Sequence, residues 1–183
     1  MQVTPAPITG VLILEPKVFA DRRGFFLESW NRKTFRQATG LNVQFVQDNH
    51  SRSQRGVLRG LHYQLTKPQG KLVRVTQGKV RDVMVDLRKS SPSFGQHVTV
   101  ELSGENHRQL WIPPGCAHGF VVLSEIADFL YKTTDYYVPE DEQCIRWDDP
   151  DLDIDWRLGA LVPRLSARDR QGSAFKDAPI YLL

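Results

Sequence analysis

The chain has 183 residues, of which 40% are hydrophobic and 25% are charged, and this composition excludes a disordered or collagen-like protein. Lysine and arginine number 24 against 21 aspartates and glutamates, so the formal charge of +3 is too small to indicate nucleic-acid binding. The length favours a single domain over residues 1–183.

The sequence gives no sign of export or of a membrane span. Its longest apolar runs, such as residues 11–14 and 120–123, fall far short of the ~20 residues that a membrane helix needs. Its first ten residues lack a basic region followed by an apolar core, so we expect no secretory signal. The two cysteines, Cys116 and Cys144, are therefore expected to be reduced thiols in the cytoplasm.

One early helix is predicted, and most later segments alternate as strands do. Asn31 is a suitable helix cap, Phe35 and Ala38 would be buried, and Gly40 would end the helix. Period-two patterns then predict strands with one buried face. The residues expected to share a face are Lys71, Val73 and Val75; Val98, Val100 and Leu102; and Ala127, Phe129, Tyr131 and Thr133.

Two segments depart from simple alternation. In residues 79–88, Val83 and Val85 are out of phase with Val80, which predicts a bulge near Arg81 and Asp82. From about residue 148, frequent Pro, Asp and Gly predict irregular structure with short helical turns. Many short strands with few helices favour a β-sandwich or barrel, and no glycine-rich phosphate-binding fingerprint supports a Rossmann or P-loop fold.

His62 is the first candidate catalytic residue. On a regular strand it shares a face with Leu58 and Gly60, so its side chain is expected to point inward. A neutral imidazole is the usual general base near neutral pH, although a buried histidine can also be purely structural. Arg59 falls on the opposite face of a regular strand. Either a bulge re-aims one of the two, or they serve different pockets, or one reaches a neighbouring subunit.

A second histidine lies in the pattern P-x-G-x-x-H formed by Pro113, Gly115 and His118. This pattern resembles the second signature of the cupin superfamily, whose fold is a small jelly-roll barrel. Metal-dependent cupins pair it with H-x-H on an earlier strand, and here the matching stretch ends in Gln64 instead of histidine. Glutamine is a poor ligand for iron, zinc or copper, so we expect no catalytic metal.

Tyr131 and Asp169 each carry two interpretations. A tyrosine on a buried strand face commonly only hydrogen-bonds its hydroxyl, but it can also donate a proton opposite a base. Asp169 follows a potential cap at Ser166 and fits the first turn of a helix, or it orients a histidine.

Arginines gather in the first half of the chain and suggest an anion site; they are Arg22, Arg23, Arg52, Arg55, Arg59 and Arg74.

Taken together, these motifs resemble the dTDP-4-dehydrorhamnose 3,5-epimerase family. The matching segments run in one order through most of the chain: F-A-D-R-R-G-F-F-L-E at 19–28, F-V-Q-D-N-H-S at 45–51, V-L-R-G-L-H at 57–62, Q-G-K-L-V-R at 69–74, D-L-R-K-S-S-P-S-F-G at 86–95, L-W-I-P at 110–113 and A-H-G-F at 117–120. The resemblance implies a cupin-like jelly-roll with a few short helices, a homodimer, and activity without a metal or other cofactor.

The resemblance also implies a role for individual residues. His62 would be the base, Asp169 its orienting partner, Tyr131 the acid on the other face of the sugar, and Lys71 the cation beside the enolate oxygen. The dTDP-sugar would be held by Arg23, Glu28, Gln47, Asp48, Asn49, Arg59, His118, Glu142 and Arg168, with Phe26 or Tyr137 stacked on thymine. The family typically has lysine where this chain has Arg168.

The chemistry fits these residue types. Both carbons beside a 4-keto group have acidified protons, and inversion needs a base on one face of the ring and an acid on the other. The implied reaction converts dTDP-4-dehydro-6-deoxy-D-glucose to dTDP-4-dehydro-L-rhamnose, in dTDP-rhamnose biosynthesis. The alternatives are a single-site epimerase or ketoisomerase of a related dTDP-sugar pathway, a non-catalytic sugar-binding cupin, and a metal-dependent cupin oxygenase.

Overall fold

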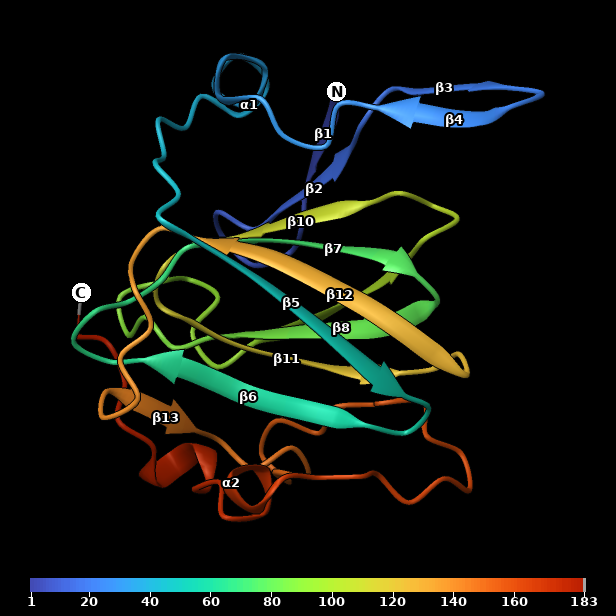
Figure 1. Cartoon of the computed structure of the whole chain (residues 1–183). Helices are drawn as coiled ribbons and strands as arrows, with labels where there is room; N and C mark the ends of the chain where they lie inside the picture. The colour runs from blue at the N-terminus through green and yellow to red at the C-terminus, as the bar shows by residue number, and fades with distance from the viewer. Residues whose placement is uncertain (183) are drawn as a thin grey trace.

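Two antiparallel sheets packed face to face form the body of the protein in the computed structural model, which describes residues 1–182 (Figure 1). The larger sheet has the strand order β1 (Gln2–Pro5), β2 (Leu12–Glu15), β10 (Gln109–Ile112), β7 (Lys71–Gln77), β12 (Ile126–Thr133) and β5 (Gln47–Gln54). The smaller has the order β13 (Glu142–Cys144), β6 (Leu58–Gln64), β11 (Cys116–Val122), β8 (Lys79–Asp86) and β9 (His97–Ser103). The predicted cupin-like jelly-roll is confirmed.

The main core lies between the two sheets and confirms the predicted strand faces. Val73 and Val75 of β7, Val100 and Leu102 of β9, and Ala127 and Phe129 of β12 all belong to it. Phe120 of β11 stacks on Phe129 with ring centroids 4.2 Å apart, which ties the two sheets together at their centre. Tyr131 packs against this core from the half-buried end of β12.

The predicted early helix is α1 (Arg32–Thr39), and its ends are where the sequence places them. The side chain of Asn31 accepts hydrogen bonds from the backbone N–H groups of Lys33 and Thr34, and Gly40 ends the helix with φ of 75°. Phe35 is buried against Trp111 of the larger sheet, with ring centroids 5.9 Å apart. Ala38 is only half-buried. The helix therefore covers one end of the outer face of this sheet (Figure 1).

The bulge predicted near Arg81 and Asp82 is wrong. Strand β8 pairs in continuous register with β9 and β11 through both residues. Val80 and Met84 face the core between the sheets, whereas Val83 and Val85 face a second core on the outside. Both faces of β8 are buried, so its apolar residues need not keep a single phase.

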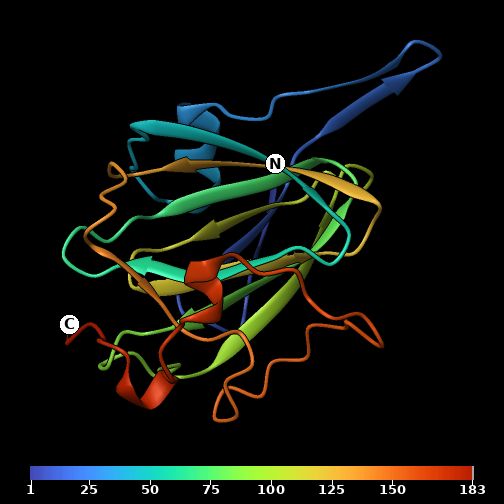
Figure 2. The same cartoon turned by 60° about the horizontal axis from the view of Figure 1, so that its bottom comes forward.

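The second core is made by the C-terminal segment, which folds across the outer face of the smaller sheet (Figure 2). As predicted, this segment is irregular beyond residue 148, and up to residue 182 its helices are the short α2 (Ala167–Arg170) and the 3₁₀ helix η1 (Phe175–Asp177). Trp156 and Tyr181 are buried in it, and Tyr181 donates a hydrogen bond to the backbone oxygen of Gln64. This packing brings α2 beside β6.

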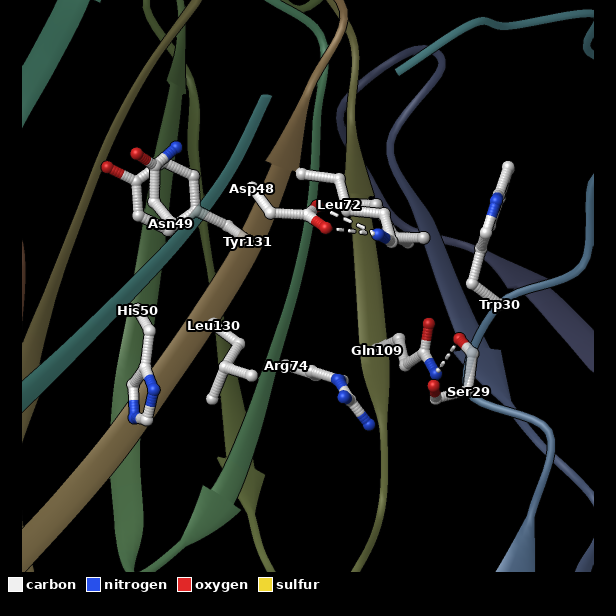
Figure 3. A pocket seen from close by; sticks show the side chains of 11 residues that line it. Ser29, Trp30, Asp48, Asn49, His50, Leu72, Arg74, Gln109, Leu130 and Tyr131 are labelled. Carbon is white, nitrogen blue, oxygen red and sulfur yellow. Dashed lines mark hydrogen bonds and ion pairs between the residues drawn. The ribbon is translucent and has the colours of Figure 1, made fainter. Parts of the chain in front are cut away.

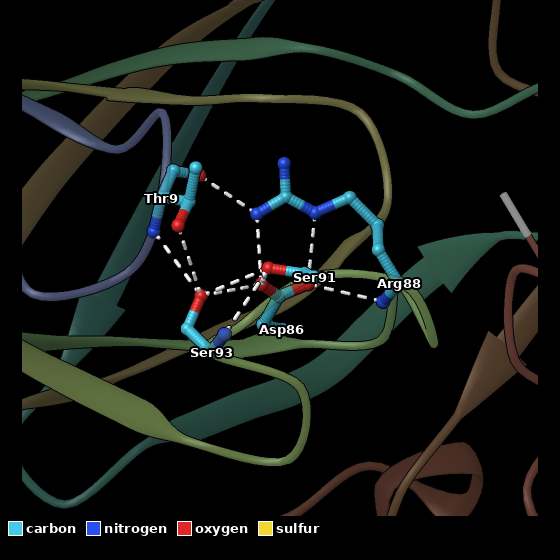
Figure 4. Close-up of polar contacts among 5 residues, drawn as sticks. All are labelled: Thr9, Asp86, Arg88, Ser91 and Ser93. Atoms are coloured by element: carbon cyan, nitrogen blue, oxygen red, sulfur yellow. Dashed lines mark hydrogen bonds and ion pairs between the residues drawn. The ribbon is translucent and has the colours of Figure 1, made fainter.

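A polar cluster around Asp86 joins the first loop to the smaller sheet (Figure 4). The fully buried Asp86 carboxylate accepts hydrogen bonds from Arg88 Nε at 2.8 Å, Ser91 Oγ at 2.6 Å and Ser93 Oγ at 2.7 Å. Arg88 Nη2 also donates to the backbone oxygen of Thr9 at 2.7 Å. The buried charge of Asp86 is thus balanced by hydrogen bonds from Arg88, Ser91 and Ser93, and Arg88 links this cluster to the backbone of the first loop.

One hairpin stands apart from both sheets. Strands β3 (Val18–Asp21) and β4 (Gly24–Leu27) pair only with each other and project from the body (Figure 1). Phe25 and Phe26 of this hairpin are 61% and 68% exposed. Among residues 1–182, none of the helices is both long and apolar enough to cross a bilayer.

Candidate active site

A polar cavity of about 410 Å³ opens between the two sheets, within the size range of small-molecule sites. Strands β5, β7 and β12 contribute side chains from one sheet, and β6, β11 and β13 contribute them from the other. The cavity contains nine of the sequence-predicted residues: Gln47, Asn49, Arg59, His62, Lys71, His118, Tyr131, Tyr137 and Glu142. Gln69, His50 and Ser51 also line it and were not predicted.

Arg59 and His62 both reach this cavity because β6 is irregular between them. His62 pairs with His118 of β11, and Arg59 pairs with Phe120, so three steps along β6 match two along β11. Of the alternatives open from the sequence, the bulge is the one present. As a consequence, Leu58 does not share the face of His62 as expected but packs into the outer core.

His62 and Asp169 form a close pair at the bottom of the cavity. Nε2 of His62 lies 2.8 Å from Oδ1 of Asp169, although no acceptor is aligned with the direction of an Nε2–H bond. Asp169 is 3% exposed. Burial alone would raise the pKa of Asp169, but contacts with His62, Ser166 and the N–H of Gly60 outweigh it and lower the pKa to about 2. The predicted cap at Ser166 is present, and Ser166 and Asp169 form a reciprocal capping box that holds this carboxylate in place.

Tyr131 faces the cavity from the other sheet. It lies on β12 between Asn49 of β5 and Val73 of β7 and so sits across the barrel from β6. Burial raises the pKa of Tyr131, and the positive charge of Arg59 opposes that rise. The phenol is therefore protonated at neutral pH and is available as a proton donor.

A third charged group consists of Lys71, Asp82 and His118. Nε2 of His118 lies 3.0 Å from both carboxylate oxygens of Asp82, which is fully buried. Burial raises the pKa of Asp82, and the nearby His118 and Lys71 counteract it. Burial lowers the pKa of Lys71 to about 8, against the attraction of Asp82. Sequence reasoning missed Asp82, although a charged residue between Val80 and Met84 on a buried face was the available signal.

The rim of the cavity is a hydrogen-bonded chain of side chains. Tyr137 Oη donates to Glu142 Oε2 at 3.0 Å and accepts from Arg168 Nη1 at 3.1 Å. Arg168 also forms an ion pair with Glu142. Gln47 accepts a hydrogen bond from the backbone N–H of Tyr137 at 3.0 Å. Arg168 is therefore placed beside the cavity, because Tyr137 and Glu142, which it contacts, both line the cavity.

Besides Arg168, which contacts the lining without being part of it, four predicted binding residues do not line the cavity. Asp48 was expected there, but it alternates with Gln47 and Asn49 along β5 and pairs with Lys132 Nζ at 2.7 Å on the outer face of the sheet. Figure 3 shows Asp48 directed toward the side of Trp30 and Arg74, away from the ring of Tyr131. The other three belong to the hairpin and its connection to α1: Arg23, Phe26 and Glu28.

These three side chains are engaged locally or exposed. Arg23 pairs with Asp21 in the tip of the hairpin, and its side chain is 85% exposed. Glu28 accepts hydrogen bonds from Asn31 and Thr34 at the start of α1. The cavity of this chain is therefore formed without the hairpin.

Gln64, which stands where metal-dependent cupins have their second histidine, makes hydrogen bonds outside the cavity. Gln64 donates from Nε2 to the backbone oxygens of Lys67 and Tyr136, and its Oε1 accepts from the N–H of Val138. Its side chain fixes the loop after β12 instead of entering the cavity. The expectation that Gln64 is not a ligand therefore has a structural basis.

A jelly-roll barrel with a histidine–aspartate pair and a tyrosine across one polar cavity defines a cupin-like protein equipped for acid–base chemistry. The family model described as dTDP-4-dehydrorhamnose 3,5-epimerase matches residues 5–177. The chain belongs to this family and is an isomerase.

Individual relatives agree with this assignment. A dTDP-4-dehydrorhamnose 3,5-epimerase of Pseudomonas aeruginosa is 61% identical over 181 residues, which is 99% of each chain. The crystal structure of the epimerase RmlC from Legionella pneumophila, in complex with dTDP-4-keto-L-rhamnose, has a TM-score of 0.94 at 51% identity and covers 100% of this chain and 99% of that one. ChmJ, a 3'-monoepimerase from Streptomyces bikiniensis in complex with dTDP-quinovose, has a TM-score of 0.88 at 33% identity, covering 95% and 87%.

Proposed function

We propose that this enzyme inverts both carbons beside the 4-keto group of dTDP-4-dehydro-6-deoxy-D-glucose and releases dTDP-4-dehydro-L-rhamnose, as a step of dTDP-rhamnose biosynthesis. The observation that carries the proposal is the placement of His62 and Tyr131 on facing sheets of one polar cavity. Inversion needs a proton removed from one face of the ring and returned on the other. The family membership and the Legionella complex support this substrate.

In the proposed reaction, His62 takes the proton from the carbon beside the ketone, and the electron pair moves to the carbonyl oxygen to give an enolate. Asp169 orients the imidazole and stabilises the imidazolium that forms. Lys71 stabilises the developing oxyanion in the cavity. Tyr131 then donates its proton to the opposite face of the carbon, and solvent restores both groups before the second carbon reacts.

The diphosphate and the base need groups outside the acid–base pair. Arg59 lines the cavity close to Ser53, whose Oγ accepts hydrogen bonds from its Nε at 3.2 Å and its Nη2 at 3.1 Å. The remaining N–H groups of the Arg59 guanidinium can donate hydrogen bonds to phosphate oxygens. Arg168 adds positive charge at the rim, and the exposed ring of Tyr137 beside it is available to stack on thymine.

Solvent deuterium tests the reaction directly. The protein is incubated with dTDP-4-dehydro-6-deoxyglucose in deuterated water, and the product is analysed by NMR. We expect deuterium at both ring carbons and none with His62→Ala, while the His97→Ala control on β9 exchanges at the normal rate. Absence of deuterium with the wild-type protein would sink the proposal, and normal exchange by His62→Ala would refute the base.

A single-site epimerase is the second candidate, since the 3'-monoepimerase ChmJ shares this fold at 33% identity. Both activities use the same base and acid, and they differ in how the ring is presented for a second proton transfer. Counting deuterium atoms per product molecule separates them. Two atoms support the double epimerisation, and one atom at a single carbon supports the alternative.

We also propose that the enzyme is a homodimer in which the β3–β4 hairpin serves the cavity of the second subunit. Phe26 is exposed on the hairpin, and Arg23 lies at its tip away from its own cavity. Mixing inactive Arg23→Ala and His62→Ala proteins should restore activity, because a mixed dimer has one site with both residues. No recovery, or a monomer in sedimentation, would contradict this arrangement.

The remaining expectations are part of the same proposal. Residues 1–183 act as one domain, since the C-terminal segment supplies Asp169 and seals the smaller sheet. The enzyme works without a cofactor, because proton transfer needs no electron carrier. It works in the cytoplasm, where its two free thiols stay reduced. Full activity after exhaustive dialysis against a chelator is the expected result. Loss of activity that added metal restores would refute it.

A further inference from the structure

Three potential metal-binding side chains meet beside the cavity, and one of them, His62, also lines it. The ligand atoms of His62, Cys144 and Asp169 all lie within 4.8 Å of one another. They come from three elements: β6, β13 and α2. Cys144 stands directly opposite His62 in the β13–β6 ladder, and it is two residues from Glu142, so both β13 side chains face the cavity side. The acid–base mechanism uses His62 and Asp169 and gives Cys144 no task.

Two of the three ligand atoms, those of His62 and Cys144, have no well-aligned short hydrogen bond to another group. Nε2 of His62 is buried and has no aligned hydrogen-bond partner, while the side chain as a whole is 25% exposed to the cavity. The Cys144 thiol makes only a 3.6 Å contact with the backbone oxygen of Ile145. Asp169 is held in place by Ser166 Oγ at 2.6 Å and by the N–H of Gly60 at 3.1 Å. A rigid carboxylate therefore stands next to two lightly held donors.

An imidazole nitrogen, a thiol sulfur and a carboxylate oxygen form a donor set that suits Zn²⁺ among the common divalent cations. Zinc bonds of about 2.0–2.3 Å with tetrahedral angles place neighbouring ligand atoms roughly 3.3–3.6 Å apart. The set therefore needs side-chain movements of about 1 Å to close around one ion.

We propose that His62, Cys144 and Asp169 form an inhibitory Zn²⁺ site at the catalytic base. Zinc binds Nε2 of His62 and one carboxylate oxygen of Asp169; the Nε2 proton moves through solvent to Nδ1, and the Cys144 thiol releases its proton to solvent as the Zn–S bond forms. No oxidation state changes. The ion thereby separates Nε2 of His62 from Asp169 and leaves the imidazole proton on Nδ1, so that this nitrogen can no longer accept a proton from the substrate. Binding itself is independent of the proposed function, whereas the inhibition rests on it.

Cobalt substitution tests the site without an activity assay. Co²⁺ stands in for Zn²⁺, and a thiolate ligand gives a charge-transfer absorption in the near ultraviolet. We expect this band for the wild-type protein and for the control Cys116→Ser, whose thiol is buried in the core between the sheets. Cys144→Ser and Cys144→Ala should lack the band, and added Zn²⁺ should remove it from the wild-type protein. A wild-type protein without a thiolate band overturns the site.

Zinc titration of the epimerisation rate tests the inhibition. Each protein is compared with its own rate in chelator, so any effect of the substitution on the basal rate cancels. We expect Zn²⁺ to inhibit the wild-type protein and Cys116→Ser alike, reversibly with chelator. Loss of the only thiolate ligand should raise the half-inhibitory zinc concentration by at least about tenfold in Cys144→Ser. Equal inhibition of Cys144→Ser and the wild-type protein overturns the inhibitory role. A protein without epimerase activity but with the cobalt band refutes the proposed function and leaves the metal site standing.

Discussion

Arg59 and His62 line the same cavity although they are an odd number of residues apart on one strand. On a regular strand they would face opposite sides. The register between β6 and β11 shifts by one residue between them, and Gly60 occupies the irregular step with φ of 119°. The guanidinium proposed to bind the diphosphate and the proposed base are therefore brought together by a local irregularity of the backbone.

Gly60→Ala should disrupt this arrangement. A Cβ at Gly60 would lie 2.6 Å from the Cα of Gly119 and 2.7 Å from the backbone oxygen of His118, and neither backbone atom can move away independently. Together with the positive φ, this should lower the free energy of unfolding by about 2–4 kcal/mol. Chemical denaturation gives the stability change, and the activity of the folded fraction reports on Arg59 and His62.

Gly40→Ala is the matched control for this substitution. Gly40 also has a positive φ, of 75°, but a Cβ there meets nothing within 4 Å. The backbone cost alone should be about 1 kcal/mol, with unchanged activity. Equal losses of stability for the two variants would show that close approach to β11 is unimportant.

Tyr131→Phe should separate proton removal from inversion. His62 remains able to take the substrate proton and return it to the same face, so solvent exchange into the substrate continues. Net epimerisation should fall by about 10²–10⁴-fold, the usual contribution of a general acid. NMR follows both processes in one sample. Tyr136→Phe, on a 62% exposed residue outside the cavity, should behave as wild type. Unchanged inversion by Tyr131→Phe would remove Tyr131 from the mechanism.

The alkaline limb of the pH profile should report on Lys71. Its pKa is lowered to about 8 by burial, so the ammonium is charged below this pH and neutral above it. If the charge stabilises the enolate, kcat/KM declines as pH rises through about 8. Lys71→Arg should have a lower maximal rate but no such decline, because a guanidinium stays charged. A decline that persists in Lys71→Arg would assign it to another group.

Asp86 should stabilise the fold in a pH-dependent way. Burial raises its pKa, but hydrogen bonds from Arg88, Ser91 and Ser93 outweigh this and hold the pKa below the ordinary value of 3.8. A carboxyl with a lowered folded pKa stabilises the protein above its unfolded pKa, and that contribution is lost as pH falls through the folded value.

Asp86→Ala should therefore lose about 3–5 kcal/mol of unfolding free energy at neutral pH, because Arg88 is left without its carboxylate. Thermal and denaturant unfolding at several pH values measure the effect. The difference from wild type should shrink in acid. Asp21→Ala removes a similar pair on the exposed hairpin and should change stability little. A loss for Asp86→Ala that is independent of pH would contradict the role of its charge.

Much of the fold and of the site was predictable from local sequence. Period-two alternation identifies the buried faces of β7, β9 and β12 because side chains on a strand alternate by geometry alone. The caps at Asn31, Gly40 and Ser166 are equally local, since each depends on atoms within a few residues. The motifs that resemble a known family led to His62, Lys71, Tyr131 and Asp169, which the structure brings to one cavity or into contact with it.

Most of the predictions that failed depended on contacts with residues distant along the chain, whereas the error at Asp48 was local. The supposed bulge in β8 was misread because a C-terminal segment buries the outer face of the smaller sheet. The orientation of Leu58 was misread because β6 shifts its register against β11. Asp82 was missed because its importance comes from His118 and Lys71 on other strands. Asp48 was included with its neighbours, although alternation along β5 turns it to the opposite face.

The sequence by itself determined the strand pattern, the helix ends and the set of chemically capable side chains, because these depend on residue type and short-range geometry. Only the tertiary structure decided which of those side chains meet. Strand register joins Arg59 to His62, sheet packing sets Tyr131 across from them, and the C-terminal segment carries Asp169 and Arg168 to the cavity. Each of these contacts closes a long loop of chain and is fixed by packing that no local pattern records.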